Sequence, residues 1–221
     1  MLIHGLMERP MSGQSIEERS MGIIEALCPS HGFSRWEWIL AKRLVHTTGD
    51  PRIVDDLHFG GPWFENGTAA LRGRAPIVCD ARMIKSGISL ARLQAVHPGY
   101  TSSDVHCSVD APEVHAQARA AGLPRSLFNV RALRELLNGA ICCFGNAPVG
   151  LMELSRLIVE EGCRPAVVIA MPVGFVHVVE SKRELMRLDV PYVAIDGRRG
   201  GSPLAVASLH AICLAAKGLA P

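Results

Sequence analysis

The sequence predicts a doubly wound α/β fold, with a mainly parallel five-stranded sheet and helices on both of its faces. Short apolar runs rich in β-branched residues alternate with longer segments of helical periodicity, as strands and helices do in such folds. The runs are apolar almost throughout, which is typical of parallel strands covered on both faces. The expected strands are PIVCD (76–80), DVHCSVD (104–110), AICCFG (140–145), AVVIAM (166–171) and YVAID (192–196).

The helical segments carry recognisable end signals. SIEERSMGIIEAL (15–27) opens with Ser15 and Glu18 at the spacing of a capping box. NAPVGLMELSRLIVEEG (146–162) and SPLAVASLHAICLAAKG (202–218) each have proline near the start and glycine at the end, as bounded helices do. In the first segment, helical spacing places four apolar side chains on one face: Ile16, Ile23, Ile24 and Leu27.

The turns after the expected strands are candidate ligand sites, because doubly wound sheets bind ligands beyond the carboxyl ends of their strands. Glycine, asparagine and proline gather there in GNAP (145–148) and GRRGGSP (197–203). The backbone amides of such turns could receive an anion. The alternative is a pair of tight turns without a ligand, and neither turn has a nucleotide-binding fingerprint.

Composition narrows the class of protein. The 221 residues are 48% hydrophobic and 20% charged, which fits a single packed domain over 1–221. The net charge is only +2, so no basic field for nucleic acid is expected. No apolar run reaches the roughly 20 residues that span a bilayer, and the start lacks a secretory signal pattern. We therefore expect a cytoplasmic protein that binds neither nucleic acid nor membranes.

The seven cysteines predict structural thiols rather than a metal site. The sequence has no C-x-x-C pair, and most cysteines lie in apolar segments, where a reduced thiol behaves as a small hydrophobic group. The adjacent Cys142 and Cys143 should point to opposite faces of a strand. No histidine pair has zinc-binding spacing on a helix.

The segment RLVHTTGD (43–50) ends an expected helix, RWEWILAKRLVH (35–46). Arg43 and His46 are three residues apart, so both lie on one side of the helix and could face an anionic ligand together. An imidazole can carry a proton near neutral pH and act as an acid, although Arg43 would oppose that charge unless anions offset it. The alternative is a C-cap histidine stabilised by the helix dipole.

Two other segments hold candidate ligands for carboxylates. LPRSLFNV (123–130) would present the Arg125 guanidinium and the Ser126 hydroxyl at a helix start, and the alternative is an ordinary N-cap serine beside a solvated arginine. ESK (180–182) is first a surface charge pair and second a substrate contact through Lys182.

Several motifs, in their order and spacing, resemble those of the precorrin-8X methylmutase family, also called cobalt-precorrin-8 methylmutase. The resemblance covers about residues 10–215. The motifs are IEERSMGII, RLVHTTGD, APIVCDARMIKSGI, GAICCFGNAP, MPVGFVHVVESK and GRRGGSPLAVASLHAI.

The resemblance implies a flavodoxin-like α/β domain that forms homodimers, with tetrapyrrole pockets shared between subunits. It implies a reaction that moves a methyl group from C11 to C12 of the corrin-forming ring, with no cofactor beyond the substrate. His46 takes the place of the family's acid. Ser20, Arg43, Arg125, Ser126 and Lys182 take the places of residues that contact the substrate.

Three departures from the family pattern leave alternatives open. Pro124 replaces the threonine of Thr-Arg-Ser, Val149 replaces the threonine of Gly-Asn-Ala-Pro-Thr, and His177 replaces a small residue, usually glycine. A non-catalytic corrinoid-binding or carrier protein is therefore a second hypothesis. A flavin or nucleotide module is a third, based on the fold class alone. The sequence also leaves open whether the substrate carries cobalt.

Overall fold

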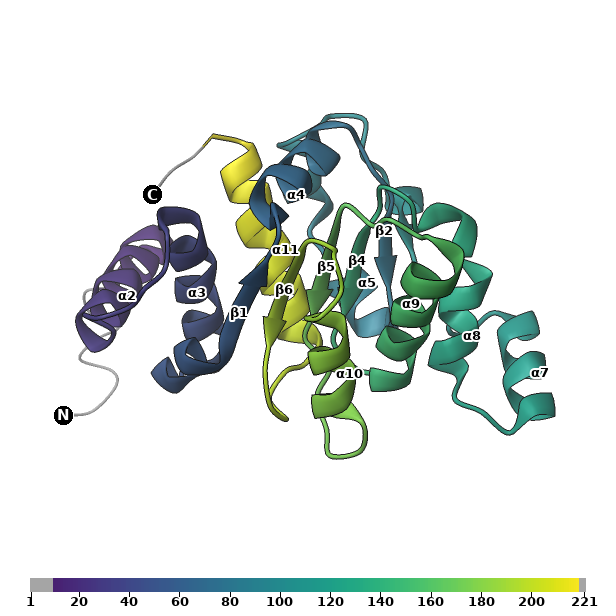
Figure 1. Ribbon diagram of the computed structural model, residues 1–221. Coiled ribbons are helices and arrows are strands. Elements are labelled where there is room, and N and C mark those ends of the chain that lie inside the picture. Colours follow the sequence, from purple (N-terminus) through teal and green to yellow (C-terminus); the bar gives the residue numbers. More distant parts are fainter. Residues whose placement is uncertain (1–9, 219–221) are drawn as a thin grey trace.

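The computed structural model describes residues 10–218, which form a six-stranded sheet with helices on both faces (Figure 1). The strand order is β1-β6-β5-β4-β2-β3. Neighbouring strands are parallel, except that β1 is antiparallel to β6. The strands are β1 (Leu57–Gly60), β2 (Ile77–Cys79), β3 (Val105–His106), β4 (Ile141–Phe144), β5 (Val167–Ala170) and β6 (Tyr192–Ile195).

The predicted doubly wound class and its five parallel strands are confirmed. Strands β2 to β6 follow the flavodoxin-like order, in which the chain changes direction across the sheet between β2 and β4. The predicted strand number is wrong by one, because the edge strand β1 adds to the five. Its sequence, LHFG, is buried at one residue and exposed or half-buried at the others, so it lacks the continuous apolar pattern of the inner strands.

The third strand is shorter than predicted. The sequence indicated a strand over 104–110, but β3 ends at His106. The chain then turns, and the Ala111 N–H donates to the Ser108 carbonyl at 2.9 Å. This turn brings residues 107–111 over the carboxyl end of the sheet, where they border a cavity described below.

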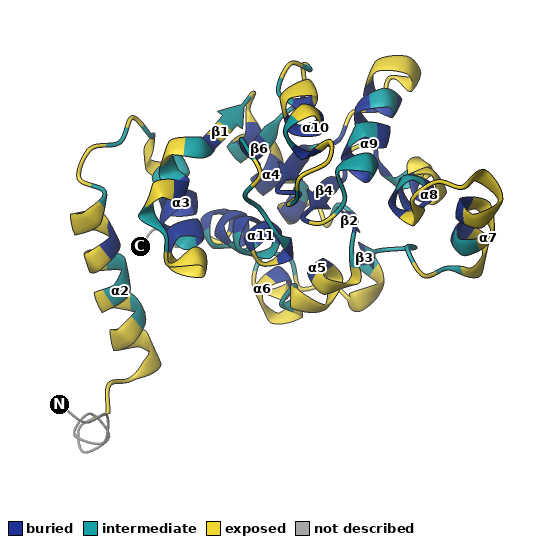
Figure 2. Ribbon diagram, turned by 90° about the horizontal axis from the view of Figure 1, so that it is seen from below, coloured by how far each residue is buried: buried dark blue, intermediate teal, exposed yellow. Residues whose placement is uncertain are grey.

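The helices form two layers around the sheet. One core cluster contains residues of α2, α3, α4, α5, α6 and α11, and a second contains residues of α8, α9 and α10. In Figure 2 the strands and α11 are largely buried, whereas α2 and α7 have long exposed faces. The helices are α2 (Gly13–Leu27), α3 (Arg35–Thr48), α4 (Trp63–Arg72), α5 (Arg82–Gly87), α6 (Leu90–Gln94), α7 (Pro112–Ala121), α8 (Arg125–Ala132), α9 (Pro148–Glu161), α10 (Val178–Leu185) and α11 (Ser202–Ala216).

Successive side chains of the inner strands enter opposite layers, as the pleat of a strand requires. In β4, Cys143 belongs to the first core cluster and Cys142 to the second. The prediction that these two cysteines face apart is confirmed. All seven cysteines are free thiols.

Two predicted helices, α9 and α11, end as expected, and α3 continues two residues beyond its predicted end at His46. Gly49 and Gly162 adopt left-handed backbone conformations just after α3 and α9, with φ of 67° and 71°. Glycine is favoured there because a Cβ atom strains this conformation. Pro203 lies in the first turn of α11, and Gly218 follows that helix.

The beginning of α2 differs from the prediction. The N-cap is Ser12, whose side chain accepts from the Ser15 N–H, so Ser15 lies inside the helix rather than at its cap. Of the apolar face, only Ile24 is buried. Ile16, Ile23 and Leu27 are 53%, 53% and 59% exposed. Within residues 10–218, most of the apolar face of α2 is therefore left uncovered.

No helix within residues 10–218 is both long enough and apolar enough to cross a membrane.

Candidate active site

His46 lies in the last turn of α3, close to the carboxyl end of the sheet. Its Nδ1 atom is 3.0 Å from the Ser20 hydroxyl of α2, 26 residues earlier in the chain. The C-cap is Gly49, and its N–H donates to the Val45 carbonyl. His46 is therefore not the C-cap residue that the alternative reading required, and its ring is oriented by a second helix instead.

This contact leaves the other ring nitrogen available. When the Ser20 hydroxyl donates to Nδ1, the proton of the neutral imidazole is on Nε2, and a protonated imidazole has N–H donors at both positions. The His46 side chain is exposed, and Ser20 is half-buried. In either of these two forms, the exposed His46 ring presents an Nε2–H beside α2 and α3.

Arg43 lies one turn before His46, as the sequence predicted, and is bound by an acid that the sequence did not reveal. Its Nη1 atom donates to the Glu17 carboxylate of α2. This hydrogen bond is the main cause that lowers the pKa of Glu17. Glu17 therefore offsets the positive charge beside His46. The available signal was its position three residues before Ser20, on the same side of the helix.

A second histidine on this side of the sheet is not an acid candidate. His210 of α11 accepts a hydrogen bond from the Ser89 N–H at 3.0 Å, through Nε2. Burial, assisted by the charges of Arg92 and Arg43, lowers the pKa of His210 to about 4. His210 is therefore neutral at pH 7.

Arg125 and Ser126 lie at the other end of the molecule, at the start of α8. In Figure 1, α7 and α8 are at the right, and α2 and α3 are at the left. Arg125 donates to Asp110 at 3.2 Å, and its Nη1 is 2.9 Å from the His115 Nε2 atom. The described chain therefore brings Ser20, Arg43 and His46 together but does not bring Arg125 beside them.

The predicted N-cap role of Ser126 is wrong. Pro124 has the extended backbone of the N-cap, and α8 begins at Arg125, so Ser126 is already helical. Ser126 is only 7% exposed, and its hydroxyl has no hydrogen-bond partner within the described residues. An unsatisfied buried hydroxyl is unfavourable, which makes Ser126 a candidate for bonding a ligand.

Lys182 is buried, so the expected surface charge pair at 180–182 is wrong. Its ammonium group donates to the Gly197 carbonyl at 3.1 Å and to the Arg199 carbonyl at 2.7 Å. Lys182 forms no ion pair within the part of the chain that the structure describes. These two bonds hold the loop after β6, and burial lowers the pKa of Lys182 to about 8.

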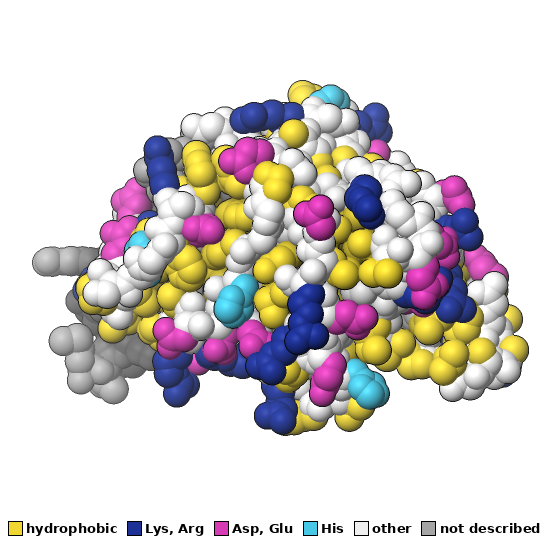
Figure 3. All heavy atoms as spheres, in the orientation of Figure 1, with side chains coloured by type: hydrophobic (Ala, Val, Ile, Leu, Met, Phe, Trp, Pro, Cys, Tyr) yellow, Lys and Arg dark blue, Asp and Glu magenta, His cyan; other side chains and the backbone are white. Residues whose placement is uncertain are grey.

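The loop held by Lys182 also contacts the segment that follows His46. Arg199 donates to Asp50 at 2.9 Å and to Asp56 at 2.5 Å. Asp50 is four residues after His46. Figure 3 shows basic and acidic side chains gathered along the lower edge, toward which the parallel strands point. Lys182 thus supports the α3 end of the site through this loop.

We expect the Lys182 charge to produce a measurable pH dependence. The folded pKa of about 8 is below the ordinary value of 10.5, so the folded state releases this proton more readily than the unfolded state. The free energy of unfolding should therefore rise between pH 8 and 10.5, by about 2–3 kcal/mol. Urea unfolding of wild type and Lys182→Met at several pH values measures this. Equal pH slopes in the two proteins would contradict it.

The turn GNAP does not offer free amides to an anion, because the chain fills it with its own carboxylate. Asp80, directly after β2, accepts from the N–H groups of Gly145, Asn146 and Ala147 at 3.0, 2.9 and 2.7 Å. Asp80 is 2% exposed. Burial raises the pKa of Asp80, and the three amide bonds oppose that rise. The reading without a ligand is correct for this turn.

The second turn is closed by its own backbone. The Gly201 N–H donates to the Met171 carbonyl at 2.8 Å. A Cβ atom on Gly200 would lie 2.3 Å from the same carbonyl, so only glycine fits there. The loops after β5 and β6 are therefore packed backbone to backbone.

Two of the departures from the family pattern are accommodated at the surface. His177 is the N-cap of α10 and has φ of 61°, a conformation that costs a non-glycine residue about 1–2 kcal/mol. Its side chain is exposed, so the imidazole does not crowd the neighbouring backbone. Pro124 is also exposed and leaves Arg125 at the first position of α8.

Known proteins resemble this chain in sequence over almost its whole length. A family model described as precorrin-8X methylmutase matches residues 15–215. The chain is 34% identical over 210 residues to the cobalt-precorrin-8 methylmutase of Leptospira interrogans, covering 91% of this chain and 93% of that protein. It is 37% identical over 203 residues to the precorrin-8X methylmutase of Pseudomonas aeruginosa, covering 90% and 94%.

A solved structure extends the similarity to the fold. The precorrin-8x methyl mutase from Thermus thermophilus has a TM-score of 0.84 and 41% sequence identity to this chain. The match covers 93% of this chain and 98% of the Thermus chain. By sequence over nearly its whole length and by fold, the chain belongs to the precorrin-8X methylmutase family, a family of isomerases in cobalamin biosynthesis.

Proposed function

We propose that this chain moves a methyl group from C11 to C12 of precorrin-8X or cobalt-precorrin-8, giving hydrogenobyrinate or cobyrinate. The observation that carries the proposal is the cluster on α2 and α3, in which Ser20 orients His46 and Glu17 pairs with Arg43. An oriented, exposed imidazole beside a guanidinium suits an acid that acts on a polyanionic ring.

His46 acts as the general acid in this proposal. A proton given to the ring makes the macrocycle electron-poor, which weakens the bond between C11 and its methyl group. The methyl group then bonds to C12, and the ring returns the proton. The reaction is an isomerisation, so it consumes no oxidant, reductant or second substrate. Ser20 keeps the imidazole in position throughout.

We further propose that the working unit is a homodimer with shared pockets. Arg125 and Ser126 begin α8, which lies at the opposite end of the molecule from α3, the helix that holds His46 (Figure 1). A second copy could place its α8 beside the first copy's α2 and α3. The exposed apolar face of α2, formed by Ile16, Ile23 and Leu27, is a surface that such a partner would cover.

The direct test is conversion of the substrate. Purified protein should change the visible spectrum of precorrin-8X or cobalt-precorrin-8 to that of the rearranged corrin. Parallel assays with the cobalt-free and cobalt-containing forms identify the natural substrate, since relatives of both names resemble this chain. Tight binding of the product without conversion of either substrate would favour the carrier hypothesis instead.

Mixed dimers test whether the pocket is shared. His46→Ala and Arg125→Ala are each expected to be nearly inactive alone. Random reassembly of the two variants should restore about a quarter of the wild-type sites, because half of the dimers are mixed and each has one intact site. Mixing each variant with itself is the control. If both residues serve one site in the same chain, mixing restores nothing.

A further inference from the structure

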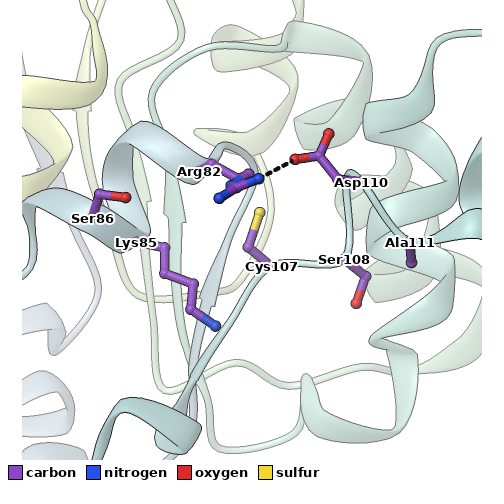
Figure 4. A pocket seen from close by; sticks show the side chains of 7 residues that line it. All are labelled: Arg82, Lys85, Ser86, Cys107, Ser108, Asp110 and Ala111. Atoms are coloured by element: carbon purple, nitrogen blue, oxygen red, sulfur yellow. Dashed lines mark hydrogen bonds and ion pairs between the residues drawn. The ribbon is translucent and has the colours of Figure 1, made fainter.

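A second polar region lies near Arg125, at the carboxyl ends of β2 and β3. It is a cavity of about 400 Å³ between α5 and the 107–111 turn (Figure 4). The cavity is lined by Arg82, Lys85, Ser86, Cys107, Ser108, Asp110 and Ala111. This volume is within the range of about 300–1,000 Å³ that is usual for ligand pockets.

The wall formed by the 107–111 turn is fixed by a buried amide. Asn129 of α8 is fully buried, and its Oδ1 accepts from the Ser108 N–H at 2.6 Å. Its Nδ2 donates to the Cys79 carbonyl, at the end of β2, at 3.1 Å. The turn therefore has a defined position relative to the sheet before any ligand binds.

The cavity carries an excess of positive charge. Asp110 bonds Arg82 through one oxygen at 3.1 Å and Arg125 through the other at 3.2 Å. Those bonds lower the pKa of Asp110, with the Arg82 hydrogen bond the largest cause. Lys85 forms neither an ion pair nor a hydrogen bond within residues 10–218. Arg82 and Arg125 thus share the one carboxylate of Asp110, and the Lys85 ammonium has no carboxylate partner among the described residues.

A larger cavity, of about 650 Å³ between α7, α8 and α9, lacks this imbalance. Its arginines are already matched by glutamates. Arg131 and Arg156 both pair with Glu153, and Arg134 pairs with Glu135 and Glu161. An anionic ligand in that cavity would have to displace the glutamates from the arginines. At Lys85 an anionic ligand would displace no carboxylate.

We propose that the cavity beside β2 and β3 binds a carboxylate side chain of the tetrapyrrole, with Lys85 as its charge partner. This inference rests on the proposed function. A lysine ammonium attracts a carboxylate by charge and donates hydrogen bonds to it. The Ser86 and Ser108 side chains line the same cavity and add hydroxyl donors. Asp110 links Arg82 to Arg125, so the cavity continues the carboxylate-binding surface that begins at Arg125.

Binding of the corrin product, hydrogenobyrinate, tests the subsite without requiring turnover. We expect Lys85→Gln to raise the Kd of the product about tenfold and to weaken its salt dependence, while Lys85→Arg stays near wild type. The control is Arg119→Gln, which removes an exposed positive charge from α7, outside the cavity. Absorbance titrations at two or more salt concentrations measure all four proteins.

Amidated ligand separates charge recognition from a structural effect. Wild type and Lys85→Gln should bind a corrin with amidated side chains equally well. An unchanged Kd of the acid in Lys85→Gln, or an equal loss for acid and amide, would overturn the subsite. If Lys85→Gln raises the Kd of the product but wild type converts no substrate, the result supports the subsite and refutes the proposed catalysis. In an active enzyme, KM should rise with Kd and kcat should stay unchanged.

Discussion

His46→Ala should lower kcat about 10²–10⁴-fold while the protein remains folded, since a positioned general acid contributes that much to a rate. His46 is exposed, and its one side-chain hydrogen bond within the described residues is with Ser20, so its loss should cost little stability. Turnover is followed by the visible spectrum of the corrin, and folding by circular dichroism. The binding of product should change much less than kcat, because the acid acts on the reacting ring.

Two neighbouring variants make this result specific. Thr47→Ala removes an exposed side chain whose one hydrogen bond within residues 10–218 is to the Arg43 carbonyl, so its kcat should stay within about a factor of two. Ser20→Ala keeps the imidazole but removes the hydroxyl that orients it, so its kcat should fall between those of the other two variants. Wild-type turnover by His46→Ala would eliminate the proposed acid.

Asp80→Ala should lower the free energy of unfolding by about 3 kcal/mol or more. Asp80 accepts from three backbone amides just before α9, and a buried amide left unsatisfied costs about 1–3 kcal/mol. For a protein of this size, 3 kcal/mol corresponds to a fall in Tm of roughly 6–12 °C. Urea and thermal unfolding measure both quantities.

Asp80→Asn is the matched variant, because it keeps an acceptor oxygen but removes the charge. We expect a smaller loss of stability than in Asp80→Ala. Burial raises the pKa of Asp80, so the folded state holds its proton more tightly than the unfolded state. The stability of wild type relative to Asp80→Asn should therefore decrease as pH rises above the ordinary aspartate pKa. Equal stability of Asp80→Ala and wild type would refute the role of this carboxylate.

The inner part of the fold was predictable because its signals are local. Five strands were identified from continuous apolar runs, and the ends of α9 and α11 from glycine and proline at helix boundaries. The edge strand β1 was not predicted, because an antiparallel edge strand is not buried on both faces and so lacks a continuous apolar run. The capping prediction for α2 failed because Ser12 and Ser15 are both suitable caps, and the choice depends on where the backbone becomes helical.

The candidate site was predictable only in part, because sequence signals are local and most of its contacts are not. Helical spacing alone put Arg43 and His46 on one side of α3. It could not show that Glu17 balances Arg43, or that Asp80 occupies the GNAP turn, because these contacts join segments far apart in the chain. Lys182 was misread as a surface residue because burial depends on what packs over a helix, not on the helix sequence.

The sequence by itself determined the α/β class, the parallel strands and the pair formed by Arg43 and His46, since periodicity and spacing act within one element. Tertiary structure decided which elements meet. It placed Ser20 against His46 across 26 residues, closed both strand-end turns with the chain's own groups, and left Arg125 at the far end beside the Lys85 cavity. The physical reason is that contacts between elements depend on how buried faces pack together, and that packing is a property of the whole chain.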